Sequence, residues 1–232
     1  MARCTVLKIG GSLIPAHARA LCLAIKSGGG SGRLVLVAGG GEIADVVRAY
    51  RRVLGLTDAT TFAMALLSMD QHALLLAELG GFPLAGSIEE LASMAEPICV
   101  LAPAGDVRRN RWCDDLDVDR VSSDAVAAFI AARIGAALVI ATDVDGIYDR
   151  NPKLAPGATL LGQVNAGDLG DSTAIDVESA AVIRRFRLEA TVLNGTQPQR
   201  VADHLAGIEV PHTKVLAEGR GNRDGVARRG AT

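Results

Sequence analysis

The stretch Ala137-Leu-Val-Ile-Ala-Thr-Asp-Val-Asp-Gly-Ile-Tyr-Asp-Arg-Asn-Pro-Lys153 decides the fold class of this chain. Residues 137–141 are all apolar with no polar alternation, which predicts a strand covered on both faces. Polar and turn-forming residues follow directly, including Thr142, Asp143, Asp145 and Gly146. In an open α/β sheet, ligands bind where such strands end. The stretch therefore predicts a buried strand that leads into a ligand-binding loop.

Strand and helix patterns alternate along the rest of the chain, and 106–120 is polar and irregular. Strands separated by helices favour a mostly parallel sheet covered on both faces. We expect one domain over 1–216, followed by a disordered Gly- and Arg-rich tail at 217–232. Strands are predicted at 5–9, 34–38, 98–102, 137–141 and 191–193, with an edge strand at 213–216. Helices are predicted at 15–26, 42–54, 57–79, 87–94, 122–134, 175–186 and 198–205.

Composition and charge give no reason to expect a nucleic-acid-binding, membrane or metal-binding protein. The chain has 232 residues, 49% of them apolar and only 3% aromatic, so we expect an aliphatic core. A net charge of -2 gives no reason to expect a nucleic acid or a membrane surface as partner. We find neither a signal peptide nor an apolar run that could span a bilayer. The four cysteines lack metal-ligand spacing, which favours reduced thiols in a cytoplasmic protein.

Three polar or glycine-rich loops each follow a predicted strand or precede a predicted helix. Lys8-Ile-Gly-Gly-Ser-Leu13 combines a lysine with bare backbone amides and a hydroxyl. Ala38-Gly-Gly-Gly-Glu-Ile-Ala-Asp45 removes three Cβ atoms from a helix N-terminus, where a phosphate is stabilised by the helix dipole. Val121-Ser-Ser-Asp-Ala-Val126 opens another helix. Neither glycine loop has the Walker A or dinucleotide spacing, and either one alone is more often only a turn.

The motifs K-I-G-G-S-L, A-G-G-G-E-I-A-D, S-S-D-A-V-A, A-T-D-V-D-G-I-Y-D and V-L-N-G occur in this order. The set resembles the ordered motifs of the amino acid kinase family over residues 3–216. The resemblance implies a three-layer αβα sandwich with a mostly parallel central sheet. It also implies an ATP-dependent kinase that uses Mg²⁺ and acts on a small molecule.

The resemblance also implies roles for individual residues. Lys8 would neutralise the transferring phosphoryl group, and Asp124 would organise Lys8. The alternative for Asp124 is a first-turn carboxylate that simply suits the helix dipole. The other implied roles are ATP-phosphate contacts for Gly10, Gly11 and Ser12, acceptor contacts for Gly39, Gly40 and Gly41, and nucleotide contacts for Thr142, Asp143, Asp145, Gly146 and Tyr148.

Departures from the family narrow the choice of acceptor. Gly41 is not followed by the histidine of isopentenyl phosphate kinases, and the K-L-S-G-E start of uridylate kinases is absent. The segment 140–207 resembles the branch that phosphorylates [5-(aminomethyl)furan-3-yl]methyl phosphate in methanofuran biosynthesis. The acceptor is therefore expected to be a small phosphate monoester. Alternatives are UMP, isopentenyl phosphate, an acyl carboxylate, or a non-catalytic nucleotide-binding storage or regulatory protein.

Several assignments stay open at this stage. The place of the family's second catalytic lysine reads Ser172-Thr-Ala-Ile-Asp-Val-Glu178, and we consider Arg184, Arg185 or Arg187 as substitutes. Asp70 is a candidate to meet the substrate's amino group, with Asp45 and the acidic residues of 114–119 as others, and the alternative for Asp70 is an exposed helical carboxylate without such a role. Trp112 is expected to stack on the furan ring or to anchor its loop. His17, His72, His204 and His212 have no metal spacing, so surface or capping roles are expected for them, and whether Mg²⁺ has direct protein ligands stays open. A homo-oligomer is expected through the apolar surface at 62–76.

Overall fold

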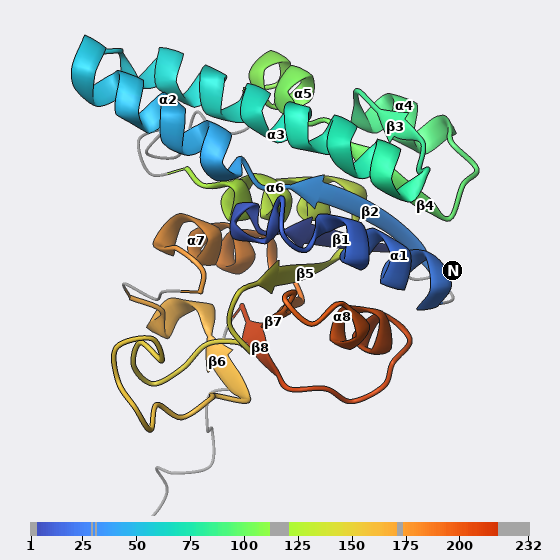
Figure 1. The fold of residues 1–232 in the computed structure, drawn as a ribbon, viewed down its shortest axis with the longest axis vertical. Coiled ribbons are helices and arrows are strands. Elements are labelled where there is room, and N and C mark those ends of the chain that lie inside the picture. Colours follow the sequence, from blue (N-terminus) through green and yellow to red (C-terminus); the bar gives the residue numbers. More distant parts are fainter. Residues whose placement is uncertain (1–3, 29, 31, 112–120, 171–173, 218–232) are drawn as a thin grey trace, which may run out of the picture.

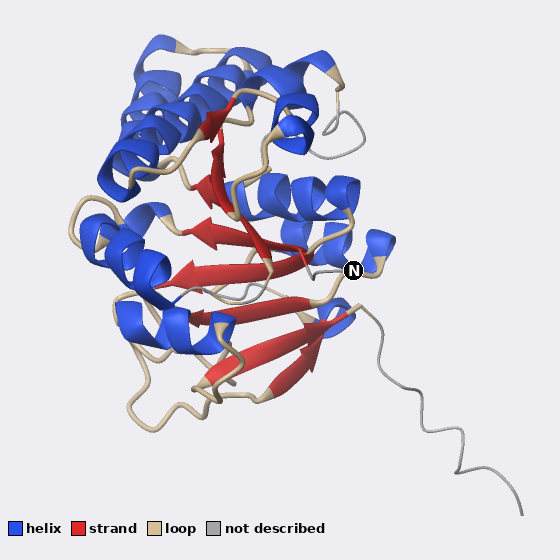
Figure 2. Cartoon of the chain, turned by 90° about the vertical axis from the view of Figure 1, so that its right-hand side faces the viewer, coloured by secondary structure: helices blue, strands red, loops and turns tan. Residues whose placement is uncertain are grey.

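A single eight-stranded sheet runs through the computed structural model, which describes residues 4–28, 30, 32–111, 121–170 and 174–217 (Figure 2). The strand order is β3-β4-β2-β1-β5-β7-β8-β6, and all neighbours are parallel except the antiparallel pair β7 and β8. The strands are β1 (Cys4–Ile9), β2 (Arg33–Ala38), β3 (Leu84–Ala85), β4 (Ile98–Leu101), β5 (Ala137–Thr142), β6 (Gln163–Asn165), β7 (Ala190–Asn194) and β8 (His212–Leu216).

Helices cover both faces of this sheet, so the predicted αβα sandwich is confirmed (Figure 1). On one face, α6 (Ser123–Ile134) and α7 (Val177–Phe186) pack against Val6, Leu138 and Ile140. On the other face, α1 (Ala18–Gly28) and α8 (Pro198–Leu205) pack against alternate residues of the same strands. The central strands are buried on both sides, as their unbroken apolar runs predict.

Two long helices, α2 (Gly41–Leu54) and α3 (Asp58–Gly80), form a hairpin beside the β2–β4 part of the sheet (Figure 1). The hydroxyl of Thr57 accepts the first-turn amide of Thr60, and Gly55 and Gly81 end the two helices with φ of +65° and +62°. Within the described residues, α3 is long and apolar enough to cross a membrane by length and composition alone. Its buried residues instead pack on the sheet and on α1.

Four local differences from the sequence expectations have physical reasons. The strand predicted at 213–216 exists as β8, but its predicted place at the edge of the sheet is wrong. Residues 163–165 pair with it as β6 and occupy the edge. β3 and β6 are too short to show a two-residue repeat. Residues 106–109 of the segment expected to be irregular belong to α5 (Ala104–Arg109). α1 begins at residue 18, after a 3₁₀ turn η1 (Gly11–Leu13) and a cis Ile14–Pro15 bond. The remaining elements are α4 (Ile88–Ser93) and a second 3₁₀ turn, η2 (Ala166–Asp168).

Candidate active site

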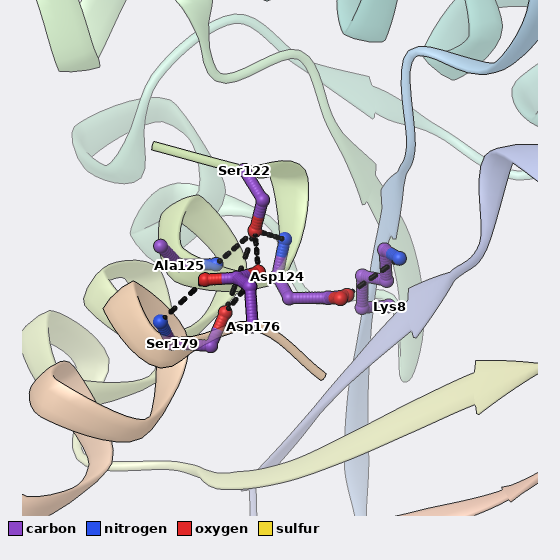
Figure 3. Close-up of polar contacts among 6 residues, drawn as sticks. All are labelled: Lys8, Ser122, Asp124, Ala125, Asp176 and Ser179. Atoms are coloured by element: carbon purple, nitrogen blue, oxygen red, sulfur yellow. Dashed lines mark hydrogen bonds and ion pairs between the residues drawn. The ribbon is translucent and has the colours of Figure 1, made fainter. Parts of the chain in front are cut away.

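Lys8 and Asp124 form a buried ion pair beside the carboxyl edge of the sheet (Figure 3). Lys8 lies near the end of β1, and Asp124 lies in the first turn of α6. The Lys8 Nζ atom is 2.5 Å from Asp124 Oδ1, and the two side chains are 7% and 13% exposed. The resemblance predicted this pairing, and the structure brings the two residues together.

Burial raises the pKa of the Asp124 carboxyl, because the charged form loses its hydration. The positive charge of Lys8 opposes this increase, and the negative charge of Asp176 adds to it. Asp124 is therefore a carboxylate whose ionisation depends on its lysine partner.

The first two glycine loops touch each other through their main chains. A Cβ atom on Gly11 would lie 2.3 Å from the Gly41 nitrogen, and one on Gly39 would lie 2.6 Å from the Gly11 nitrogen. Gly41 has a φ of +51°, which disfavours any other residue there. The Gly10 amide donates to the Ala141 carbonyl at 2.8 Å, which ties the first loop to β5. The amides that begin η1 and α2 are thus held side by side.

His72 and Ser68 on α3 support the second glycine loop from behind. The Nδ1 atom of His72 lies 2.6 Å from the Gly39 carbonyl oxygen, and the ring is buried. A Cβ on Gly40 would lie 2.4 Å from Ser68 Oγ. The surface or capping role expected for the histidines is therefore wrong for His72. In the sequence, the one indication of this role is that His72 follows Ser68 by four residues, which places both on the same face of the predicted helix.

A cavity of about 340 Å³ opens between these loops, the α2–α3 hairpin and the start of α6. Of the residues predicted to bind phosphates or acceptor, it contains Gly11, Ser12, Gly40 and Gly41. Its charged lining residues lie on α2. The wall comprises Gly11, Ser12, Ile14, Gly40, Gly41, Glu42, Ala44, Asp45, Arg48, Phe62, Ala65, Leu66, Met69, Val121, Ser122, Ser123 and Val126.

Asp176 connects the N-termini of α6 and α7 (Figure 3). Ser122 accepts the amides of Asp124 and Ala125 at 3.0 and 3.2 Å, and its hydroxyl donates to Asp176 Oδ2. Asp176 in turn accepts the amide and hydroxyl of Ser179 at 2.8 and 2.9 Å. This residue lies in the segment searched for a second lysine. Sequence reasoning missed it, although an aspartate just before a helical pattern is a cap signal.

The loop after β5 is anchored to its neighbours by Asp145. Its Oδ1 atom accepts from Arg200 at 2.6 Å and from Asn194 at 2.9 Å. Burial, together with the Asp145 carboxylate, raises the pKa of Tyr148. A separate ion pair joins Asp143 and Lys153 at 2.6 Å.

The backbone of the same loop leaves no room at Gly146, where a Cβ atom would lie 2.4 Å from Thr213 Oγ1 of β8. A second cavity of about 580 Å³ adjoins this loop and is lined by Tyr148, Asp149, Asn165 and Asp168 among others. The residues predicted to bind nucleotide, within 142–148, thus lie in one loop at the carboxyl edge of the sheet, and contacts of Asp145 and Gly146 hold this loop in place.

The arginines considered as substitutes for the second lysine lie at the wrong end of α7. The ten residues of this helix span about 15 Å, and Arg184 and Arg185 are in its last turn. Arg187 lines a cavity with residues 137–139, at the start of β5. Arg200, in contrast, reaches the carboxyl edge through its contact with Asp145.

Asp70 does not line the cavity. Its Oδ1 atom accepts the Ala104 amide at 3.0 Å, in the first turn of α5, and burial raises its pKa. A contact between Asp70 and substrate stays a prediction, but the structure gives the carboxylate a different partner. Trp112 and the residues 114–119 lie outside the described part of the chain.

Among the described residues, no group of three or more His, Cys, Asp or Glu side chains is arranged to hold a metal ion. Bare amides and close glycine contacts suit phosphates, because no side chain stands between them and the backbone.

Comparisons with known proteins agree with this fold. The chain belongs to the amino acid kinase family, whose model matches residues 3–187. A [5-(aminomethyl)furan-3-yl]methyl phosphate kinase from Methanocaldococcus jannaschii is 31% identical, over 91% of this chain and 97% of the relative. A uridylate kinase from Methanoregula boonei is 32% identical, over 86% and 90% of the two chains. The protein is thus a phosphotransferase that phosphorylates a small molecule.

Solved structures show the same fold at lower identity. The uridylate kinase of Archaeoglobus fulgidus superposes with a TM-score of 0.70 at 23% identity, covering 91% of this chain and 99% of the other. An isopentenyl phosphate kinase superposes with a TM-score of 0.64 at 20% identity, covering 91% and 100%.

Proposed function

We propose that the protein transfers the γ-phosphoryl group of ATP to the phosphate of a small monoester, giving a diphosphate and ADP. The observation that carries this proposal is the buried Lys8–Asp124 pair together with a cavity lined by glycines of two loops and by Ser122 and Ser123, which precede Asp124. A lysine held by a buried carboxylate is a preorganised charge, which stabilises a transferring phosphoryl group without reorganisation.

The residues suit an acceptor that is already a nucleophile. A phosphate monoester has a second pKa of ~6, so it is largely dianionic at neutral pH and needs no general base. Its oxygen forms a bond to the γ-phosphorus while the bond between the γ-phosphorus and the β,γ-bridging oxygen breaks, and ADP leaves. The amides of the two loops and Lys8 would hold the two anions in line against their repulsion. Bound Mg²⁺ would neutralise further charge on the ATP phosphates.

The proposed acceptor is [5-(aminomethyl)furan-3-yl]methyl phosphate, as in the biosynthesis of methanofuran-type cofactors. Support comes from the relative of that name, which aligns over nearly its whole length. UMP is a second candidate, because a uridylate kinase is 32% identical over a similar range. We also propose that the protein acts in the cytoplasm.

The test is ADP release with a panel that contains the furan phosphate, UMP, isopentenyl phosphate and an acyl carboxylate. The proposal expects the highest kcat/KM for the furan phosphate, with a furan diphosphate as the product by mass. Turnover of UMP without turnover of the furan phosphate would refute the acceptor. Nucleotide binding without turnover of any acceptor would instead support a storage or regulatory role.

A further inference from the structure

The outer wall of the 340 Å³ cavity carries a negative charge that the phosphoryl chemistry does not use. Its charged lining residues are Glu42, Asp45 and Arg48, all on α2. Arg48 Nη1 lies 2.5 Å from Asp45 Oδ1, with the two side chains 63% and 70% exposed. Two carboxylates against one guanidinium leave the α2 side of the cavity with an excess of negative charge, with Glu42 in the first turn next to Gly41 and Asp45 nearly one turn further along. This side would repel a second anionic group and attract a cationic one.

The two ends of the cavity differ in chemistry. At its inner end are the N-terminus of α2 and the bare loop at Gly40 and Gly41, which suit an anion. The rest of the lining is mostly apolar and suits a flat ring. The apolar side chains are Ile14, Phe62, Leu66, Met69 and Val126.

The spacing along α2 sets how far a ligand must reach. Asp45 follows Gly41 by four residues, which is a rise of about 6 Å along the helix. A molecule that places a phosphate against Gly41 therefore reaches Asp45 with a group on the other side of one small ring. An acceptor in which a five-membered ring separates a phosphate from an ammonium group fits this arrangement.

We propose that Asp45 binds the ammonium group of the acceptor and is the residue that selects an aminomethyl-bearing phosphate monoester. Arg48, one turn further along α2, holds the Asp45 carboxylate at the cavity wall. The inference rests on the proposed function and adds the residue that recognises the substrate's cation. UMP, isopentenyl phosphate and acyl carboxylates have no cationic group for Asp45 to bind. Asp70, the other carboxylate considered, is hydrogen-bonded to the Ala104 amide outside this cavity.

The experiment compares two acceptors in which only the cation differs: the aminomethylfuran phosphate and its analogue with a methyl group in place of aminomethyl. We expect the wild type to favour the amino compound by about tenfold in kcat/KM, equivalent to about 1.4 kcal/mol. Asp45→Asn should reduce this preference to about threefold or less, mainly through KM for the amino compound. Asp45→Glu should restore part of the preference.

The matched control is Asp58→Asn, which removes another exposed carboxylate of the α2–α3 hairpin from an ion pair with Arg51, outside the cavity. It should leave the preference unchanged. Equal losses for both acceptors in Asp45→Asn, or a preference unaffected by it, would overturn the role of Asp45 while the proposed function stands. A wild type that turns over neither furan compound but does turn over UMP would overturn the proposed function itself.

Discussion

Lys8 and Asp124 show how a single pair of residues links fold to chemistry. Each would be costly to bury alone, and together they compensate most of that cost. The pair forms because β1 and the first turn of α6 lie next to each other at the carboxyl edge. The sequence could predict the two residues from the family motifs, but not the burial that makes each depend on the other.

Replacing Lys8 should reduce catalysis more than folding. Lys8→Ala removes the preorganised charge, so kcat should fall by at least about 10²-fold. Steady-state kinetics with saturating ATP measure this, and far-ultraviolet circular dichroism checks the fold. A kcat within a few-fold of the wild type would remove Lys8 from the proposed mechanism.

The same variant should show a characteristic pH dependence of stability. Without Lys8, the pKa of Asp124 loses the cause that lowers it and rises further above its ordinary value. A carboxyl with a raised folded-state pKa contributes stability that is present at low pH and lost as pH rises through that pKa. The destabilisation of Lys8→Ala relative to wild type should therefore be larger near pH ~8 than near pH ~5 in urea unfolding. The double variant Lys8→Ala with Asp124→Asn should show no such trend.

The contact between the glycine loops gives a steric prediction. Gly11→Ala places a methyl group 2.3 Å from the Gly41 nitrogen, so one main chain must move. We expect a loss of about 1–3 kcal/mol in the free energy of unfolding and a severe loss of activity. Gly162→Ala is the control, because nothing lies within 4 Å of its added Cβ. Similar thermal midpoints and rates for both variants would show that the loops do not need to touch.

At the scale of elements, Asp176 holds the starts of α6 and α7 together, and Asp124 lies one residue beyond α6's first position. We predict that Ser122→Ala lowers kcat about tenfold or less and costs about 1 kcal/mol of stability, since the α6 cap and the bridge are lost together. A double-mutant cycle with Asp176→Asn should give a coupling energy of about 0.5–3 kcal/mol. Thr57→Ala is the control. It removes the α3 cap, so it should lower the free energy of unfolding but leave kcat unchanged. Additive effects of Ser122 and Asp176 would argue against the bridge.

The accuracy of the sequence predictions varied between elements for physical reasons. α2, α3 and α8 were predicted closely, because caps, glycines and a first-turn proline mark their ends. α5 depends on distant partners: Asp70 accepts its first amide, and its own Asp106 accepts the amide of Ile88. No local pattern encodes such contacts. For the same reason Asp176, His72 and Arg200 were missed as parts of the site, whereas the loops carrying bare glycines were found.

At the scale of the whole molecule, the sheet order gathers the ends of β1, β2, β5 and β7 at one edge, which is why loops far apart in sequence form one site. The extent of the domain, over 1–216, stays a prediction. The α2–α3 hairpin carries several exposed apolar side chains, which are Val46, Tyr50, Val53, Leu54, Leu67 and Leu74.

We predict that these exposed apolar side chains are buried in a homo-oligomer, as expected from the sequence for the segment 62–76, which contains Leu67 and Leu74. Light scattering coupled to size exclusion should give a multiple of the 24.0 kDa chain mass. Tyr50→Glu with Val53→Glu should shift the mass towards the monomer, while Arg133→Glu, on α6, should not. A wild type that elutes at monomer mass across the micromolar range would exclude this assembly.

The interlocked glycine turns have a consequence for how such a protein can diversify. The two glycine loops meet through their main chains with no side chain between them. A substitution there can only push the loops apart and cannot tune the distance between them. The part of the cavity proposed to bind the phosphates is therefore fixed in its dimensions. Adaptation to new acceptors is left to those side chains of the helical hairpin that line the cavity and, unlike Ser68 and His72, do not support the glycine turns.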